Sequence, residues 1–564
     1  MPSAVLPRAI LLTVSLLSGC AAADSSGVQV GPGGRAAASS SVYGNFLAGR
    51  FALNHGDFDA AANDLLMALA ATPNDPDLLQ QAFTASVNAG RPEAVQLARR
   101  LPSNQVGQMI LANDAAKSGN WGQAIARFQG LPRDGFMQLL QPLLLAWAWH
   151  GAGNPEQASV TLRPFIDNSR FRAVVVLHAA LIADLSGRAR EAASLFQLAA
   201  SDLSGQGPRT AMIVASWMSR TGRTEEGAAL LRQMAAASPE ASIALPGMIA
   251  LLGKRQVNTA LDGLAEIYST FGAALRTPET NDFAMVMTRL ALDVKPDFPA
   301  VRLLAADIQV AARHPDAALG LLESAMRTSD YIAPIIRLRR ATLLEQIGRS
   351  DEAIREVERV GRDYPDSSLP DIALADLLRS KRRFAEAIVA YDRVIAGIRQ
   401  PTANDWIVYY GRGIAYERTG QWSRAETDFQ HALTLSPDQP SVLNYLGYAW
   451  ADMGRNLERA YALVQRAAAR RPNDGAITDS LGWVRYRQGH FQDAMKFLEK
   501  AVGLEPEDGT ITDHLGDVYW AVGRRIEAHY QWRRALTLKI VPEDAAKIEA
   551  KIKSHPNGAM ASEK

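Results

Sequence analysis

Apolar residues recur every three or four positions along most of residues 43–538, which is the spacing that places them on one face of an α-helix. No long stretch alternates apolar and polar residues in the manner of a half-buried strand. Glycines and prolines separate the helical stretches at short intervals. The pattern therefore predicts an all-α protein built from many short amphipathic helices.

The helical stretches are self-similar, with a period near 34 residues. The repeat is clearest between residues 409 and 538, where a glycine recurs at positions 413, 447, 482 and 516 and an alanine at positions 425, 460, 494 and 528. Self-similarity at this period indicates stacked helix–turn–helix units. Each unit alone has an exposed apolar side, and stacking against the next unit buries it.

This pattern resembles the tetratricopeptide repeat (TPR) family. In that family two small residues, such as Gly482 and Ala494, let the two helices of a unit approach closely, and a bulky residue, such as Leu498, fills the space between them. A glycine such as Gly489 forms the turn, and a proline such as Pro506 follows the second helix. The equivalent residues of the other late units are Gly413, Gly447 and Gly516; Ala425, Ala460 and Ala528; Phe429, Val464 and Trp532; Gly420, Gly454 and Gly523; and Pro437 and Pro472, with Ala432, Ala467, Ala501 and Ala535 where the next unit stacks.

The resemblance implies a right-handed superhelical solenoid of about twelve TPR-type helix pairs. We expect N-terminal TPR-like repeats over residues 42–261 and C-terminal TPR repeats over residues 301–540. Residues 262–300 fit the motif poorly because Pro278, Pro296 and Pro299 break the helical pattern, so we expect a degenerate repeat or a bend there. Residues 541–564 contain PEDAAKIEAKIK, charged on most sides, which predicts a solvated capping helix followed by a disordered tail.

The N-terminus has the features of an export signal. Arg8 precedes an apolar run at residues 9–17, which is shorter than the roughly 20 residues that cross a bilayer and has the length of a signal-peptide core. The motif Leu17-Ser18-Gly19-Cys20 then resembles a bacterial lipobox, and Cys20 is the only cysteine of the 564 residues. The resemblance implies a lipoprotein signal peptide over residues 1–19 and a lipid on Cys20. The alternatives are an ordinary secretory signal with a chance cysteine and an unprocessed apolar N-terminus.

Residues 20–41 are rich in glycine, alanine and serine and have almost no apolar bulk, so we expect them to form a flexible tether. In Gram-negative lipoproteins, aspartate after the acylated cysteine usually retains the protein in the inner membrane. Here Ala21 follows Cys20. The resemblance therefore implies an anchor in the outer membrane, facing the periplasm, with the inner membrane as the alternative.

Composition and motifs point away from catalysis and from nucleic acid. The chain has 60 Lys plus Arg against 59 Asp plus Glu, a balance that is unlike a general nucleic-acid binder. It contains no phosphate-binding loop, no zinc-protease motif and no serine-hydrolase elbow. The nine histidines are scattered, and His514 and His529 are interpreted as ordinary surface or groove residues. We expect no enzyme activity, no cofactor, no metal and no small-molecule substrate.

The remaining candidate site is the concave face, which the first helix of each unit lines in TPR proteins. Aromatic and charged side chains at the positions that point there would form a protein-binding groove, since such residues dominate interface hot spots. Alternatively, Trp483 and Trp520 pack between repeats. The Lys and Asn that grip a peptide carboxylate in the best-known TPR groove are missing. The candidate groove residues are Asn444, Tyr448, Asp479, Trp483, Tyr486, Arg487, Asp513, Asp517 and Trp520.

The whole layout resembles the lipoprotein adaptor of the periplasmic carboxyl-terminal processing protease. That resemblance implies a non-catalytic scaffold that binds periplasmic or outer-membrane proteins and presents substrates to a protease. The alternative is a periplasmic protein that handles the cell wall or an exopolysaccharide with a site in its groove. Such a site would need paired carboxylates, for which Asp479 and Asp513 are candidates by position alone.

Overall fold

A computed structural model describes residues 41–168, 172–201, 207–277, 279–327, 331–538 and 540–555. Within these ranges the chain forms thirty α-helices, one short 3-10 helix and no strand, which confirms the predicted all-α class. None of the helices in the described ranges has the length and apolar character that crossing a bilayer requires. The signal peptide, Cys20 and all but the last residue of the expected tether lie outside the described residues.

The helices follow one another with short connections. The first thirteen are α1 (Val42–Asn54), α2 (Phe58–Ala71), α3 (Pro76–Ala89), α4 (Glu93–Arg99), α5 (Gln105–Lys117), α6 (Trp121–Gln129), α7 (Met137–Gly151), α8 (Pro155–Asn168), α9 (Arg172–Leu185), α10 (Ala189–Ser201), α11 (Pro208–Arg220), α12 (Thr224–Ala237) and α13 (Pro239–Ala250). The next six are α14 (Ala260–Ala274), α15 (Asn281–Val294), α16 (Pro299–Ala311), α17 (Pro315–Ala325), α18 (Ala333–Gln346) and α19 (Ser350–Asp363). The last group is α20 (Leu369–Ser380), α21 (Phe384–Gly397), the 3-10 helix η1 (Ala403–Asp405), α22 (Trp406–Arg418), α23 (Trp422–Leu435), α24 (Pro440–Asp452), α25 (Leu457–Arg470), α26 (Gly475–Arg487), α27 (Phe491–Leu504), α28 (Gly509–Ala521), α29 (Arg525–Ala535) and α30 (Pro542–Ser554).

Consecutive helices pack as antiparallel pairs, from α1–α2 to α11–α12 and from α14–α15 to α28–α29. These are fourteen pairs in the described residues, compared with the roughly twelve expected. The additional pairs lie in the N-terminal half, where the repeat motif is weakest. Helices α13 and α30 stand outside the pairing.

The close approach predicted within each late unit is confirmed. A Cβ on Gly482 would lie 2.5 Å from Leu498 Cγ, and a Cβ on Gly516 would lie 2.5 Å from Trp532 Cδ1. Both partner side chains are almost completely buried. The predicted turn glycines are also confirmed, because Gly420, Gly454, Gly489 and Gly523 all have φ between 66° and 87°. The glycine and the bulky side chain therefore lock the two helices of each late unit together.

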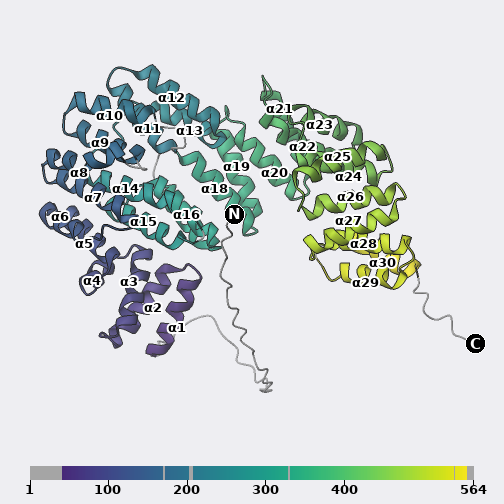
Figure 1. The fold of residues 1–564 in the computed structure, drawn as a ribbon, viewed down its shortest axis with the longest axis horizontal. Helices are drawn as coiled ribbons and strands as arrows, with labels where there is room; N and C mark the ends of the chain where they lie inside the picture. The colour runs from purple at the N-terminus through teal and green to yellow at the C-terminus, as the bar shows by residue number, and fades with distance from the viewer. Residues whose placement is uncertain are drawn as a thin grey trace, which may run out of the picture.

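The N-terminal half curves until distant helices meet (Figure 1). Residues 262–300, where a degenerate repeat or bend was expected, contain most of a regular helix pair, α14–α15, which packs back on α7, α5 and α3. The hydroxyl of buried Tyr268 donates to Asn113 Oδ1 over 3.1 Å, and Lys117 pairs with Asp293 over 2.5 Å. These contacts join residues more than 150 positions apart and close the N-terminal half into a ring.

A buried aromatic cluster fixes this closure. Gly263 of α14 lies against the indole of Trp147, so close that a Cβ would fall 2.2 Å from Trp147 Cδ2. Trp147 Nε1 donates to His178 Nδ1 over 3.0 Å. Burial lowers the pKa of His178 to about 3, so the ring stays neutral and can accept that bond. A glycine facing a tryptophan thus sets the distance between α14 and α7.

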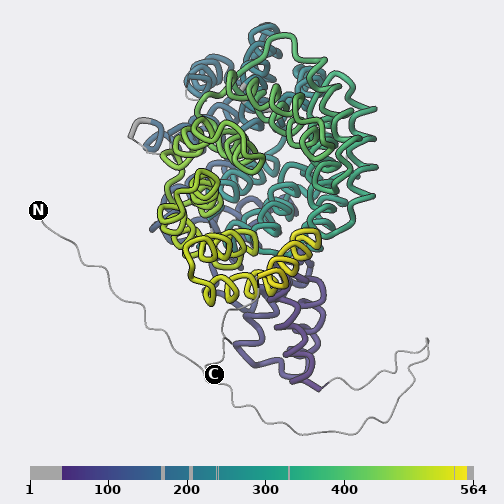
Figure 2. Tube along the Cα trace, turned by 90° about the vertical axis from the view of Figure 1, so that its right-hand side faces the viewer, coloured from purple at the N-terminus to yellow at the C-terminus, as the bar shows by residue number. Residues whose placement is uncertain are grey.

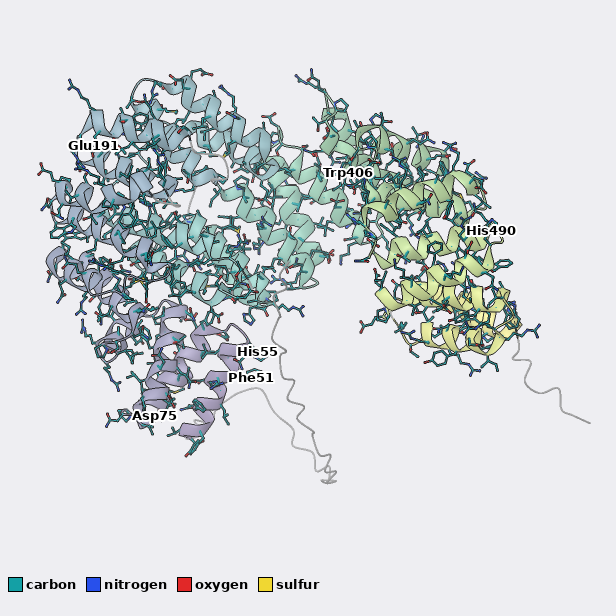
Figure 3. All side chains as sticks on the ribbon, in the orientation of Figure 1. Phe51, His55, Asp75, Glu191, Trp406 and His490 are labelled. Atoms are coloured by element: carbon teal, nitrogen blue, oxygen red, sulfur yellow. The ribbon has the colours of Figure 1, made fainter. Side chains whose placement is uncertain are left out.

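From α20 onward the C-terminal half forms a second curved arm (Figure 1). In Figure 2 the molecule is turned so that this arm faces the viewer. The two ends of the chain differ. The first described helix, α1, leaves Tyr43, Leu47 and Phe51 exposed, and Phe51 stacks on His55 at 4.0 Å between ring centres (Figure 3). At the other end of the described chain, α30 packs against α29.

We predict that Gly263→Ala lowers the melting temperature of the protein. The added methyl would overlap Trp147, which is fully buried and cannot move aside, and overpacking of this kind costs about 1–3 kcal/mol. Gly320→Ala in α17 is the matched control, because a Cβ there meets open space and alanine favours a helix. Thermal unfolding followed by circular dichroism measures both. Equal melting temperatures for the two variants would contradict the assigned role of Gly263.

Candidate functional site: the inner face of the C-terminal repeats

The nine predicted groove residues come from the first helices of three consecutive repeats. Asn444 and Tyr448 lie on α24, four residues of the set lie on α26, and Asp513, Asp517 and Trp520 lie on α28. Residues three or four apart on a helix share a face. The candidate residues therefore form one continuous surface across three repeats.

This surface is already occupied by a helix of the same chain. Lys551 Nζ of α30 donates to both carboxylate oxygens of Asp513, over 2.9 and 2.8 Å, and to Asp517 Oδ2 over 2.7 Å. Asp517 Oδ1 also accepts a hydrogen bond from Trp532 Nε1 over 2.9 Å, which fixes the orientation of that carboxylate. The acidic pair on α28 thus binds one lysine between its two members.

One face of α30 makes all of these contacts. Ile548 is fully buried, while Ala545, Lys551, Ile552 and His555 are partly buried, and the opposite face is exposed. At its first turn Glu543 lies 3.3 Å from Arg382, which is in the turn between α20 and α21. Helix α30 therefore reaches from α28 back to a repeat four units earlier. The expected helix is present and packs on the last repeat, but one of its faces is not solvated, because α30 is amphipathic and its apolar side is docked.

Burial and charge shape the acidic pair. Burial raises the pKa of Asp513, and the neighbouring negative charge of Asp517 raises it further, although Lys551 acts in the opposite direction. Burial opposes the charge on Lys551, but the two carboxylates outweigh it and raise the pKa of Lys551. The site therefore favours a cation, and the neighbouring carboxylates repel each other less when one is bound.

A second cluster lies beside the acidic pair. His514 Nδ1 is 2.9 Å from Asp479 Oδ1, and both side chains are buried. The imidazole stacks on Trp483 at 4.1 Å between ring centres, and Trp483 stacks in turn on Tyr486 at 5.0 Å. Burial alone would lower the pKa of His514, but the carboxylate of Asp479, with smaller contributions from Asp513 and Asp517, outweighs it and the pKa is raised. His514 is thus a buried partner of Asp479, and its interpretation as a surface or groove residue was wrong.

The exposed aromatic surface expected on this face is largely covered. Trp483 is only 8% exposed, which matches the alternative that it packs between repeats. Tyr448 and Trp520 are partly buried, and Trp520 meets the edge of the His555 ring at 4.6 Å. Arg487 lies 3.8 Å from Asp452. Asn444 Oδ1 is buried without a hydrogen-bond partner in the described residues.

Comparison with known proteins identifies the repeat. Three models described as tetratricopeptide repeat match residues 303–368, 406–439 and 480–508. In these three segments the chain is similar to the tetratricopeptide repeat. Among curated proteins, the TPR repeat-containing protein PA4667 of Pseudomonas aeruginosa is 30% identical over 162 residues, which are 29% of this chain. The chain matches 27% of the length of that relative.

Several solved structures are similar at low identity. A tetratricopeptide repeat protein from Parabacteroides merdae is 15% identical, covers 44% of this chain and 96% of its own, and has a TM-score of 0.38. The APC/C hetero-tetramer Cut9-Hcn1 is 14% identical, with 91% of this chain and 96% of that chain covered and a TM-score of 0.38. Yeast Tom70 is also 14% identical, with coverages of 91% and 95% and a TM-score of 0.36.

The paired carboxylates considered for a glycan-handling site are each engaged by a cationic group. Asp479 holds His514, and Asp513 holds Lys551. His529 Nε2 meets the carbonyl oxygen of His555. In the part of the chain that the structure describes, no group of three or more acidic, His or Cys residues could hold a metal ion. This face holds α30 by charge and by apolar contact.

Sequence reasoning identified one side of this site and missed the other. Asp513, Asp517 and Trp520 were named from the register of the repeat, whereas Ile548 and Lys551 were assigned to a solvated helix. A signal was present, because Ala545, Ile548 and Ile552 are spaced three and four apart and mark an apolar stripe. Charged residues occupy most of the other positions of this helix, so its composition alone suggested a solvated helix.

We predict that the stability of the C-terminal repeats depends on pH through His514. Its pKa is raised in the folded protein, so its stabilising contribution is complete below its ordinary pKa of about 6.5 and is lost as the pH rises through the raised value. Asp479→Asn removes the largest of the negative charges that raise the pKa of His514. The variant should melt below the wild type at pH 6, and the difference should shrink at higher pH.

Differential scanning calorimetry across this pH range measures the effect. His490→Gln is the control, because His490 is exposed at the start of α27 and should leave the pH profile unchanged. A constant difference between Asp479→Asn and the wild type at every pH would show that the Asp479–His514 pair has no role in the pH dependence.

Proposed function

We propose that this protein is a lipid-anchored TPR scaffold of the outer membrane, on its periplasmic side, which binds other envelope proteins and presents them to a periplasmic protease. The observation that supports it most directly is α30 docked on the inner face of the C-terminal repeats. A surface that holds one amphipathic helix of its own chain has the shape and charge to hold such a helix from another protein.

The contacts of α30 define the chemistry of the partner segment. It is an amphipathic helix with a lysine or arginine that reaches Asp513 and Asp517, and with an aliphatic residue one turn earlier in the place of Ile548. Arginine would suit the pair of carboxylates well, because its guanidinium donates in a fork. The binding energy would come from the buried aliphatic side chain and the charge-assisted hydrogen bonds together.

Helix α30 would compete with such a partner. An intramolecular helix acts at an effective concentration on the order of millimolar, so a partner must bind more tightly than α30 or arrive at high local concentration. The contacts that hold α30 are few and partly exposed: the Lys551 side chain is 27% exposed, and the Arg382–Glu543 pair is mostly in solvent. Exposed pairs of this kind contribute little stability. Displacement of α30 is therefore within the reach of a protein partner.

The anchor would supply the high local concentration. A lipid on Cys20 would confine the chain to the membrane surface, and the expected tether of about twenty residues spans roughly 25 Å. Envelope proteins would then meet the TPR surface while the chain stays attached. The N-terminal ring and the C-terminal arm offer two separate curved bodies, which suits a scaffold that brings a substrate to a protease.

We predict that a photocrosslinking residue in place of Trp520 captures envelope proteins in living cells. Trp520 lies at the docked face, and Lys551→Glu, which repels the acidic pair and loosens α30, should increase the yield several-fold. The same crosslinker in place of Tyr530 is the control, because Tyr530 is 65% exposed on the second helix of the same repeat. Mass spectrometry identifies the adducts.

The crosslinking experiment can either support or refute a groove that α30 and a partner share. Adducts from position 520 that increase with Lys551→Glu and are absent from position 530 support a groove shared by α30 and its partner. Identical adducts from both positions, or no adduct from position 520 in either background, would refute it.

We predict that Cys20→Ser releases the protein from the outer membrane. The serine cannot carry the thioether-linked lipid, so the variant should leave the outer-membrane fraction, while Ala21→Asp should move the protein to the inner membrane. Membrane fractionation with immunoblotting measures both, and mass spectrometry of the N-terminal peptide detects the lipid. An unmodified Cys20 peptide from wild-type membranes would contradict the anchor.

A further inference from the structure

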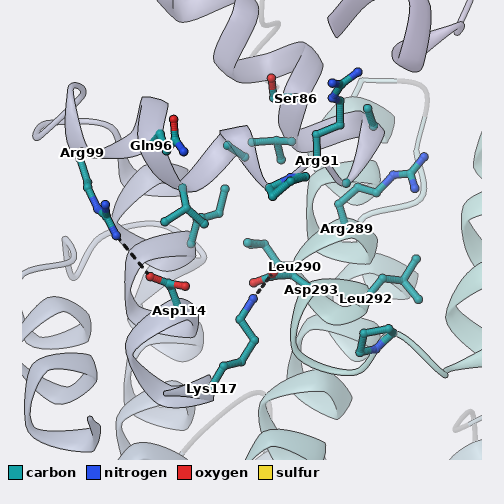
Figure 4. Close-up of a pocket in the computed structure, with 18 of the residues that line it drawn as sticks. Ser86, Arg91, Gln96, Arg99, Asp114, Lys117, Arg289, Leu290, Leu292 and Asp293 are labelled. Carbon is teal, nitrogen blue, oxygen red and sulfur yellow. Dashed lines mark hydrogen bonds and ion pairs between the residues drawn. The ribbon is translucent and has the colours of Figure 1, made fainter. Parts of the chain in front are cut away.

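A cavity of about 630 Å³ lies where the N-terminal ring closes (Figure 4). Helices α3, α4 and α5 form one wall of the cavity. Helix α15, with Pro296 and with Arg302 of α16, forms the other wall. Pockets that bind small molecules measure roughly 300–1,000 Å³, so the volume suits a compact ligand. The cavity belongs to the other half of the chain from the helix-binding face described above.

The lining of this cavity has an excess of positive charge. Five cationic side chains line it against two carboxylates, those of Asp114 and Asp293. Lys117 pairs with Asp293 over 2.5 Å, and Arg99 lies 3.7 Å from Asp114. The five cationic residues are Arg91, Arg99, Lys117, Arg289 and Arg302.

Arg91 and Arg302 each have hydrogen-bonding partners in the protein. Arg91 pairs with Glu93 over 2.8 Å. Arg302 donates to Ser324 Oγ over 2.6 Å and to the carbonyl oxygen of Pro296 over 2.9 Å. These bonds fix the positions of both side chains at the cavity edge.

Arg289 of α15 differs from the others because, among the described residues, no side chain or carbonyl is bonded to it. Its Nε is shut off from solvent and has no hydrogen-bond partner. Burial lowers the pKa of Arg289 to about 10, and the positive charge of Arg302 contributes to the lowering while Asp59 opposes it. The guanidinium is still charged at neutral pH. Arg289 is only partly buried, but its enclosed Nε makes no hydrogen bond to the described residues, and an anion in the cavity would supply the missing acceptor.

We propose that this cavity binds a small anionic ligand through a phosphate or carboxylate group that pairs with Arg289. Arg302 adds a second positive charge nearby, and the planar guanidinium of Arg289 can donate two parallel hydrogen bonds to either group. The apolar lining, which includes Val95, Ile110 and Leu290, accommodates a short hydrocarbon part of the same ligand. Because the ligand would contact both walls, its binding would hold α15 against α3–α5 and stabilise the ring.

The test uses the full-length mature protein with inorganic pyrophosphate and succinate as separate probes. Isothermal titration calorimetry at low salt should show saturable binding of at least one probe, and differential scanning fluorimetry should show a higher melting temperature with that probe. Arg289→Gln should weaken binding about tenfold or more, since hydrogen bonds to a charged group contribute about 1.5–3 kcal/mol. Arg289→Lys keeps the charge and should retain part of the affinity.

The controls separate binding from folding. Without probe, Arg289→Gln should melt at or above the wild-type temperature, because it removes a charge that has no partner. Arg302→Gln leaves Arg289 in place and should weaken binding by a smaller factor, and Arg232→Gln, at an exposed arginine far from the cavity in sequence, should bind like the wild type.

Each outcome decides the proposal. Binding of pyrophosphate alone identifies a phosphate ligand, and binding of succinate alone identifies a carboxylate ligand. No binding of either probe at millimolar concentration, or equal binding by Arg289→Gln and the wild type, would overturn it. None of these results depends on the helix-binding face or on the lipid anchor.

Discussion

The structure depends on one steric constraint, the contact between a glycine in the first helix of a unit and a bulky side chain in the second. Gly482 against Leu498 and Gly516 against Trp532 leave no space for even a methyl group. This contact aligns the two helices of a pair, but a single pair still has an apolar side that water would meet. Stacking on the next pair buries that side, so the chain gains a core only by extending as an array. The curvature of the array then produces the inner face on which α30 docks, and it brings α15 against α3 and α5 beside the charged cavity.

The same constraint has different consequences in the two halves of the chain. In the N-terminal half, Gly263 lies against Trp147 of a helix more than a hundred residues earlier, so the contact closes the array on itself. His314 Nε2 lies 3.2 Å from the carbonyl oxygen of Asn54, which adds a polar contact between a second pair of distant segments, the end of α1 and the start of α17. The C-terminal half lacks a closing pair of this kind among its described residues and stays an open arm, whose inner surface is filled by α30 instead. One half therefore has a charged cavity where it closes, and the inner surface of the other is covered by α30.

The sequence predicted those parts of the molecule that local periodicity determines. The helix pairs, the turn glycines and the buried Phe429, Val464, Leu498 and Trp532 follow from residue type at fixed spacing, and the structure has them where they were expected. The docking of Lys551 on Asp513 and Asp517 and the closure of α14 on α7 join residues far apart in the chain, and no spacing rule brings them together. Arg289 lies on α15, a helix that fits the repeat motif poorly. Its lack of a hydrogen-bond partner depends on how α15 packs against α5, and the sequence alone does not predict that packing. The expected lipid on Cys20 lies outside the described residues and stays a prediction.

The stoichiometry of the lysine site has a consequence for what can replace α30. Two carboxylates, Asp513 and Asp517, share a single ammonium group, so the docked helix leaves one negative charge uncompensated in a partly buried place. A guest that delivers two cationic groups would complete the neutralisation, whereas a guest with one would only equal what the resident helix achieves. Under the proposed function, this imbalance would favour incoming helices that carry more positive charge, at a partly buried place where salt screens weakly.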